Sequence, residues 1–146
     1  MSHHLTKREV LLIEDNVGDV FLVQEACRES DYLIDVHVVY DGEEAIYYLK
    51  QKETHKHEIE PSLVLLDLNL PTFDGKEVLK YIKCHRKFKR IPVIILTTSK
   101  SDQDIAKSYD YHANAYIQKP VDFETFIPMM NSVITFWLGT VQLPEM

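Results

Sequence analysis

Five short apolar runs alternate with longer amphipathic segments, and this alternation constrains the fold more than any other feature. The runs are "VLLI" (10–13), "IDVHVV" (34–39), "LVLL" (63–66), "PVIIL" (92–96) and "AYIQ" (115–118). Such short stretches, mostly of Val, Ile and Leu, are typical of strands that are buried on both faces of a parallel sheet. We therefore predict five strands.

Between the runs, apolar residues recur at intervals of three and four, which predicts helices. We place these helices at residues 18–30, 43–51, 75–87 and 102–112, and a last one after Asp122. Ile105, Ala106 and Tyr109 mark the fourth helix, and Asp122 is a candidate N-cap for the last. Pro128 lacks a backbone donor, so we expect it to kink the last helix or delay its start.

Strands alternating with helices predict an open α/β sheet with right-handed crossovers. We expect the flavodoxin-like layout, a doubly wound (βα)5 fold with a parallel sheet of strand order 2-1-3-4-5. The 146 residues suffice for one domain with a real core, and no repeat or linker interrupts them. We expect a single domain over 1–146, with its core at about 8–138.

Composition excludes some classes of function. A net charge of −7 argues against a nucleic-acid surface. No apolar run has membrane-spanning length and the N-terminus lacks the apolar segment of a signal peptide, so we expect a cytoplasmic protein that does not bind membranes. Cys27 and Cys84 are expected to be buried structural thiols. His55 and His57, in an exposed loop over 51–61, make a weak metal pair without a third ligand.

Polar residues follow four of the five runs. Glu14 and Asp15 end the first, Asp67 the third, Thr97 the fourth and Lys119 the fifth. The carboxyl ends of parallel strands meet at one edge of a sheet, where ligands bind. Each acid alone reads as a loop or helix cap, but a chance convergence of all five residues is much less probable.

The charges at this edge suggest what binds there. Two carboxylates ~4 Å apart repel by about 4 kcal/mol at an effective dielectric near 20, so three acids need a cation or protons. Oxygen ligands around an open position suit Mg²⁺, which also bridges to phosphate oxygens. The added Lys119 and Thr97 favour a metal together with a phosphoryl group.

The segments "LLIEDN", "LLDLNLPTFDG", "ILTTS" and "AYIQKP", in this order, resemble the receiver domain of two-component response regulators. The resemblance covers about residues 10–138. It implies that Asp67 is the phosphoacceptor, a carboxylate nucleophile. It also implies that Asp15, Asp67 and the backbone carbonyl of Asn69 bind Mg²⁺, or Mn²⁺, with Glu14 acting through water.

The same resemblance assigns the remaining residues of the edge. Lys119 would pair with the phosphoryl group, and a cis-proline such as Pro120 often follows it in this family. Thr97 would be the switch hydroxyl and Tyr116 the aromatic that changes rotamer. The implied function is a phosphorylated switch, not an enzyme, with its readout surface on the fourth helix, fifth strand and fifth helix.

A finer likeness concerns the partner. "EDNVGDVFLVQEA", "LTTS" and "FWLGTVQLP" resemble the single-domain receivers that partner bacterial phytochrome histidine kinases. This implies a sensor histidine kinase as partner, no output domain, and a homodimer through the fourth helix, fifth strand and fifth helix. Candidate dimer contacts are Tyr109, Phe136, Trp137 and Leu138. Core packing is the equal alternative for Trp137 and Leu138.

Three alternative functions are each disfavoured by particular residues. A phosphatase with an Asp nucleophile and Mg²⁺ would need a second Asp two residues on as general acid, where this chain has Asn69. A flavodoxin-like FMN or nucleotide carrier would need a Gly- or Ser/Thr-rich phosphate loop after the first strand, where "EDNVGD" places acids. A receiver that is never phosphorylated is disfavoured by the intact set Asp15, Asp67, Thr97 and Lys119.

Overall fold

The computed structural model describes residues 6–55 and 60–144, and within them the chain forms one five-stranded parallel sheet. The strands are β1 (Arg8–Ile13), β2 (Ile34–Val39), β3 (Leu63–Leu66), β4 (Val93–Thr97) and β5 (Ala115–Gln118). Their order in the sheet is β2-β1-β3-β4-β5, and every neighbouring pair is parallel. The predicted flavodoxin-like topology is confirmed.

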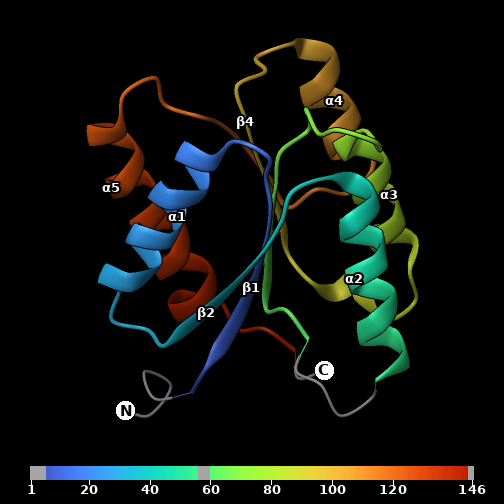
Figure 1. The fold of residues 1–146 in the computed structure, drawn as a ribbon, viewed down its shortest axis with the longest axis horizontal. Helices are drawn as coiled ribbons and strands as arrows, with labels where there is room; N and C mark the ends of the chain where they lie inside the picture. The colour runs from blue at the N-terminus through green and yellow to red at the C-terminus, as the bar shows by residue number, and fades with distance from the viewer. Residues whose placement is uncertain (1–5, 56–59, 145–146) are drawn as a thin grey trace.

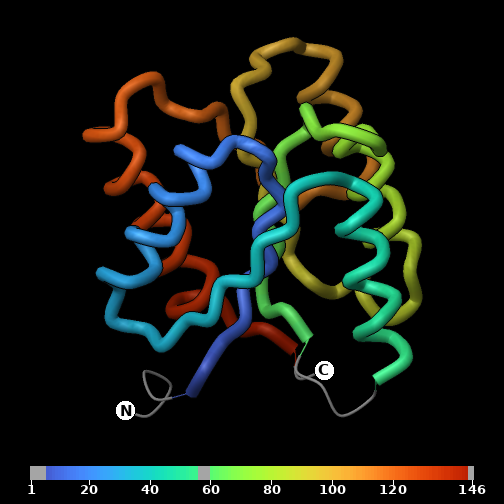
Figure 2. The backbone as a smooth tube through the Cα atoms, viewed as in Figure 1, coloured from blue at the N-terminus to red at the C-terminus, as the bar shows by residue number. Residues whose placement is uncertain are grey.

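Five α-helices cover the two faces of this sheet. They are α1 (Val17–Glu29), α2 (Gly42–Thr54), α3 (Gly75–Cys84), α4 (Asp102–Asp110) and α5 (Phe123–Ile134). Helices α1 and α5 pack together on one face, and α2, α3 and α4 lie on the other (Figure 1). The tube in Figure 2 shows how the chain passes from one helical layer to the other through the sheet. None of the helices described is long and apolar enough to cross a membrane.

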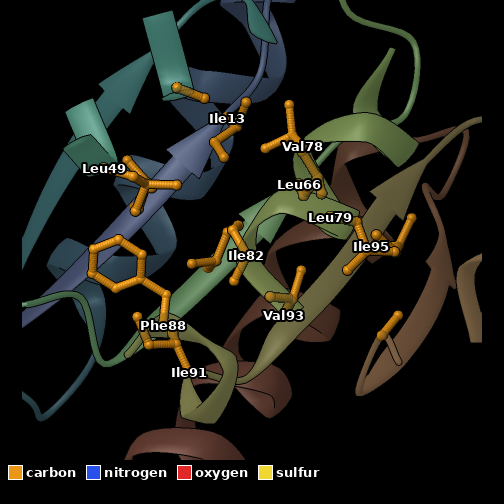
Figure 3. Packing of buried hydrophobic residues seen from close by; sticks show 14 of the residues in the cluster. Ile13, Leu49, Leu66, Val78, Leu79, Ile82, Phe88, Ile91, Val93 and Ile95 are labelled. Atoms are coloured by element: carbon orange, nitrogen blue, oxygen red, sulfur yellow. The ribbon is translucent and has the colours of Figure 1, made fainter. Parts of the chain in front are cut away.

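The central strand β1 shows why the apolar runs are continuous. Leu11 and Ile13 belong to the core under α2 and α3, whereas Val10 and Leu12 belong to the core under α1 and α5. Successive side chains of a strand point to opposite faces, and here both faces are covered by helices. Figure 3 shows the α2–α3 side, where Ile13, Leu49, Ile82 and Phe88 belong to one buried cluster.

Side-chain caps fix where the helices begin. At each of the five N-termini, the side-chain oxygen of the N-cap accepts a hydrogen bond from a backbone N–H two or three residues on; the caps are Asn16, Asp41, Asp74, Ser101 and Asp122. These bonds satisfy donors that have no partner inside the helix. These caps therefore fix the residue at which each helix starts.

Two helix ends differ from the prediction by three residues. Helix α2 continues to Thr54, so the first part of the predicted 51–61 loop is helical, and residues 56–59, including His57, lie outside the described residues. Helix α3 ends at Cys84, because the Nδ1 atom of His85 accepts hydrogen bonds from the backbone N–H groups of Lys87 and Phe88. A 3₁₀ turn, η2 (Phe88–Arg90), follows.

The last helix begins directly after Asp122, the predicted N-cap, because the Asp122 carboxylate accepts a hydrogen bond from the backbone N–H of Thr125 at 2.8 Å. Pro128 lies inside α5 and does not delay its start, so that alternative is wrong. A π-helical segment, η3 (Thr135–Thr140), continues the chain after α5. It places Leu138 in the core beside the α5 side chains.

Three smaller predictions are corrected. Cys27 is buried as predicted, but Cys84 is exposed at the end of α3. In α4, Ala106 and Tyr109 are exposed and Ser108 is the buried residue, with its hydroxyl donating to the Asp104 carbonyl at 2.7 Å. A small polar side chain fits there because it finds a partner within its own helix. The peptide bond before Pro120 is trans.

Candidate functional site

Three carboxylates gather at the carboxyl edge of the sheet, as the strand ends predicted. Glu14 and Asp15 follow β1, and Asp67 follows β3, the neighbour of β1. One oxygen of each lies within 4.8 Å of the others, and no further such group of potential metal ligands occurs among the described residues. Glu14 and Asp67 are buried, whereas Asp15 is exposed. The site therefore has a buried floor and one side open to solvent.

Lys119 reaches these acids from the end of β5. Its Nζ atom lies 2.7 Å from Oε1 of Glu14 and 3.0 Å from Oδ2 of Asp67. It also lies 2.7 Å from Oδ2 of Asp19, in the first turn of α1. The three N–H donors of the ammonium thus have three carboxylate partners.

The sequence reasoning missed Asp19. Only residues that directly follow strands were expected at the site, and Asp19 lies one turn further on, inside a helix. An acid in the first turn of a helix is also common, because it interacts favourably with the helix dipole. The available signal was "EDNVGD", in which a third acid follows the first two at a distance of about one helical turn.

Burial governs the protonation of this cluster. It raises the pKa of Glu14 to about 7, against the lowering effect of the hydrogen bond from Lys119. Burial alone would lower the pKa of Lys119, but its hydrogen bonds to Asp19 and Glu14, together with the charges of Glu14 and Asp67, outweigh burial and raise that pKa above its usual range. The cluster therefore holds one more negative charge above about pH 7 than below it, while Lys119 stays charged.

The backbone around Asp67 is tightly constrained. The Asp67 N–H donates to the Ile13 carbonyl at 3.0 Å, and the Gly75 N–H donates to the Leu68 carbonyl at 2.9 Å. A Cβ atom at Gly75 would lie 2.4 Å from the Asp67 carbonyl oxygen, so a side chain cannot be accommodated there without displacing backbone. Asn69 donates its backbone N–H to Oδ1 of Asp67 at 3.2 Å, which places its backbone beside the acid cluster.

Thr97 lies fully buried at the end of β4, next to Lys119, whose backbone N–H donates to the Thr97 carbonyl at 2.7 Å. The Thr97 hydroxyl accepts from the backbone N–H of Ser99 at 3.4 Å. Tyr116, on β5, donates its hydroxyl to the Ser99 carbonyl at 2.9 Å. The two predicted switch residues are therefore linked through Ser99, in the loop between β4 and α4.

The four predicted dimer contacts divide into two groups. Tyr109 and Phe136 are about half exposed, and Trp137 packs partly against the core with its ring edge-on to Phe136. Leu138 is 2% exposed and belongs to the core of its own chain. Its assignment as a dimer contact is wrong, because it offers no surface to a second copy.

This arrangement has the chemistry of a divalent-cation and phosphoryl site. Carboxylate oxygens on one side suit a hard cation, and the Lys119 ammonium can offset the charge of a phosphoryl oxygen. The donor set contains oxygen ligands alone and no described Cys or His, which disfavours soft metals. The residues present therefore fit the metal that the sequence implied.

Comparison with known proteins agrees with this geometry. The model of the response regulator receiver domain family matches residues 10–131. The chain belongs to this family. Response regulator Rcp1 of Synechocystis sp. (strain ATCC 27184 / PCC 6803 / Kazusa) is 41% identical over 135 residues, which are 92% of either chain. The predicted family is confirmed, and neither the phosphatase nor the flavin carrier finds support.

Two solved structures of this receiver family are similar over nearly the whole chain. One is the phosphorylated cyanobacterial phytochrome response regulator RcpA, with 42% identity and a TM-score of 0.90 over 95% of this chain and 99% of that one. The other is the Mn²⁺-bound form of Rcp1, with 40% identity and a TM-score of 0.88 over 94% and 99%. One relative is thus known phosphorylated and one with a divalent metal.

Proposed function

We propose that this response regulator accepts a phosphoryl group on Asp67 from the phosphohistidine of a sensor histidine kinase. The single observation that supports this most strongly is the contact of buried Lys119 with Asp67 at 3.0 Å, within a cluster that also includes Glu14 and Asp15. The protein would act as a switch, with phosphotransfer to itself and autodephosphorylation as its only chemistry. Its expected location is the cytoplasm, where the kinase would phosphorylate it.

In the transfer step, an Asp67 carboxylate oxygen attacks phosphorus in line, an O–P bond forms and the P–N bond to the histidine breaks. The leaving imidazole takes up a proton. Lys119 offsets charge on the phosphoryl oxygens, as preorganised donors do in phosphoryl transfer. Asp15, Asp67 and the Asn69 carbonyl would hold Mg²⁺, with Glu14 acting through water, and this ion supplies further charge neutralisation when bound.

The switch would act through the loop after β4. A phosphoryl group on Asp67 offers new acceptors to the Thr97 hydroxyl, which at present accepts from Ser99. Movement of Thr97 and Ser99 would release the Tyr116 hydroxyl from the Ser99 carbonyl and let the ring change rotamer. This changes the surface formed by α4, β5 and α5, as expected of a local charge event that biases two states.

We further propose a phytochrome-type histidine kinase as the partner, because RcpA is a phytochrome response regulator and matches this chain over most of its length. Four exposed apolar residues lie on α1 and at or just before the start of α5, the helices that follow Asp15 and Lys119; they are Val17, Phe21, Val121 and Phe123. We call them the flanking apolar residues. Exposed apolar side chains beside a charged site are a suitable docking surface for the kinase.

The central test is labelling by two phosphodonors. The protein is incubated with a phosphorylated phytochrome kinase, or with acetyl phosphate, and the label is followed with Mg²⁺, with Mn²⁺ and with EDTA. We expect hydroxylamine-sensitive labelling that needs the metal and is lost in Asp67→Asn. Undiminished labelling of Asp67→Asn would exclude the acceptor assignment, and steady turnover of p-nitrophenyl phosphate would favour the phosphatase instead.

The proposed homodimer needs its own test. Tyr109, Phe136 and part of Trp137 are available on the α4–β5–α5 side for contact with a second copy. Light scattering with and without Mg²⁺ and beryllofluoride should show a doubled mass, and Phe136→Glu should lower it. A monomeric mass under every condition would leave kinase or target binding as the readout.

A further inference from the structure

Asp19 is the third carboxylate that contacts the Lys119 ammonium, and it has no assigned role in the proposed reaction. Its Oδ2 atom accepts from Nζ of Lys119 at 2.7 Å, across 100 residues of sequence. Its own backbone N–H is held by the Asn16 side chain at 3.0 Å, which fixes the first turn of α1. The cap thus holds the Asp19 backbone while its side chain extends to the lysine.

The three partners of Lys119 differ in their exposure. The side chains of Glu14 and Asp67 are 2% and 7% exposed, whereas that of Asp19 is 22% exposed. A buried carboxylate that loses its partner is left without water, but a partly exposed one can be hydrated again. Asp19 is therefore the partner that Lys119 can release at the lowest cost.

An incoming phosphoryl group needs such a release. The ammonium has three donors, and all three are used. A phosphoryl group also brings about two negative charges at neutral pH to a cluster that already contains Glu14, Asp15 and Asp67. Asp19 adds a further negative charge to this cluster and uses one of the donors.

We propose that Asp19 is a positioning residue that competes with the phosphoryl group for the Lys119 ammonium and thereby slows phosphorylation of Asp67. This inference rests on the proposed function. In the exchange, the Lys119 hydrogen bond to Asp19 is replaced by one to a phosphoryl oxygen, and the Asp19 carboxylate becomes hydrated. No proton leaves Lys119 and no covalent bond involves Asp19.

The test compares Asp19→Asn with wild type at saturating Mg²⁺ and acetyl phosphate. We expect labelling of Asp67 to be about two- to five-fold faster in Asp19→Asn, in keeping with a partly exposed ion pair. The matched control is Asp102→Asn, which removes an exposed acid from the first turn of α4. In a Lys119→Met background, Asp19→Asn should have no effect, since the two residues act as a coupled pair.

A second measurement does not depend on transfer. Beryllofluoride, a phosphoryl mimic, is titrated with Mg²⁺ present while the Thr97 amide signal is followed by NMR. The beryllofluoride concentration at half-saturation should be about two- to five-fold lower in Asp19→Asn than in wild type. In Asp19→Glu this concentration should remain near the wild-type value.

The outcomes separate the two proposals. Unchanged or slower labelling of Asp19→Asn, or unchanged beryllofluoride affinity, would overturn the role of Asp19 and leave Asp67 as the acceptor. Wild-type protein that is never labelled would contradict the proposed function, and the titration would still test Asp19. An equal acceleration in the Lys119→Met background would also overturn the inference, because Asp19 would then act without the lysine.

Discussion

Nζ of Lys119 and Oδ2 of Asp67 lie 3.0 Å apart, although the two residues follow strands β5 and β3, which are not neighbours in the sheet. The contact crosses the end of β4, where Thr97 lies. Both side chains are at least nine-tenths buried. A single ammonium therefore ties three strand ends and the acid cluster into one unit.

The first prediction concerns the stability that depends on this ammonium. Lys119→Met should lower the unfolding free energy by about 3 kcal/mol at neutral pH, because Glu14 and Asp67 would remain buried without a cation. Mg²⁺ should restore part of the loss, since it can replace the missing charge. Urea denaturation with EDTA and with Mg²⁺ measures both effects.

A suitable control is Lys7→Met. Lys7 forms an ion pair with Asp35 at 3.8 Å, but both side chains are more than half exposed. An exposed pair contributes little, so this variant should remain within about 0.5 kcal/mol of wild type. Equal losses in the two variants would mean that burial of the Lys119 contacts has no special effect.

The second prediction concerns pH. Burial raises the pKa of Glu14 from 4.5 to about 7, so the folded protein binds a proton more tightly than the unfolded chain. In EDTA, the unfolding free energy from this group should be highest below pH 4.5 and should fall as pH rises to about 7. One pKa unit corresponds to ~1.4 kcal/mol, so the fall should be on the order of 1–3 kcal/mol.

Glu14→Gln isolates this effect, because the amide keeps the shape but cannot ionise. Urea denaturation across this pH range should give a flatter profile for Glu14→Gln than for wild type. The exposed Glu29→Gln, at the end of α1, should keep the wild-type profile. Parallel profiles for wild type and Glu14→Gln would show that Glu14 does not titrate in this range.

The strands and the strand-end residues were predictable because their physical causes are local. Both faces of the sheet are covered, so the inner strands β1, β3 and β4 are largely buried apolar runs, whereas the edge strand β2 has Asp35 and His37 exposed. Side chains that follow parallel strands meet at one edge. Glu14, Asp67 and Lys119 were found in this way. This prediction did not require knowing which residues far apart in the sequence contact each other.

The residues that were missed depend on tertiary packing. Asp19 contacts a residue 100 positions away, and its sequence signal is that of an ordinary acid at a helix start. Leu138 and Cys84 are apolar or weakly polar residues at helix ends, where the last turn decides which side faces the core. The side that faces the core depends on the π-helical turn after α5 for Leu138, and on the early end of α3 for Cys84.

The third prediction tests the close backbone approach at Gly75. Gly75→Ala should lower the unfolding free energy by about 1–3 kcal/mol, since its Cβ would lie 2.4 Å from the Asp67 carbonyl and 2.5 Å from Leu68 Cα. Gly18→Ala is the control, because its Cβ would meet only the Asn16 side chain, at 3.3 Å. A loss of equal size in both variants, measured by urea denaturation, would contradict the packing argument.

The fourth prediction separates docking from chemistry. Phe21→Glu, on the exposed face of α1, should reduce phosphotransfer from the kinase by at least about tenfold, as loss of an aromatic contact often does. Labelling by acetyl phosphate should be unchanged. Tyr47→Glu, an exposed aromatic of α2 on the opposite face of the sheet, is the matched control. Equal loss with both phosphodonors would argue against a docking role for the flanking apolar residues.

The fifth prediction concerns Asp104, which joins the loop after β4 to α3. Its carboxylate accepts from Lys76 and from the Ser99 hydroxyl, each at 2.6 Å, and these bonds lower the pKa of Asp104. Asp104→Asn should lower the unfolding free energy by no more than about 1 kcal/mol, because the pair is partly exposed.

The larger effect of Asp104→Asn should appear in the loop itself. Ser99 would lose a charged partner, and its carbonyl holds the Tyr116 hydroxyl at 2.9 Å. Hydrogen exchange at the amides of residues 99–101 should therefore accelerate several-fold, while the core amides of β1 keep their wild-type rates. Asp102→Asn, in the same first turn of α4, should leave the loop unaffected. Unchanged loop exchange in Asp104→Asn would mean that the backbone alone, without the Lys76–Asp104–Ser99 contacts, keeps the Ser99 carbonyl in place for the Tyr116 hydroxyl.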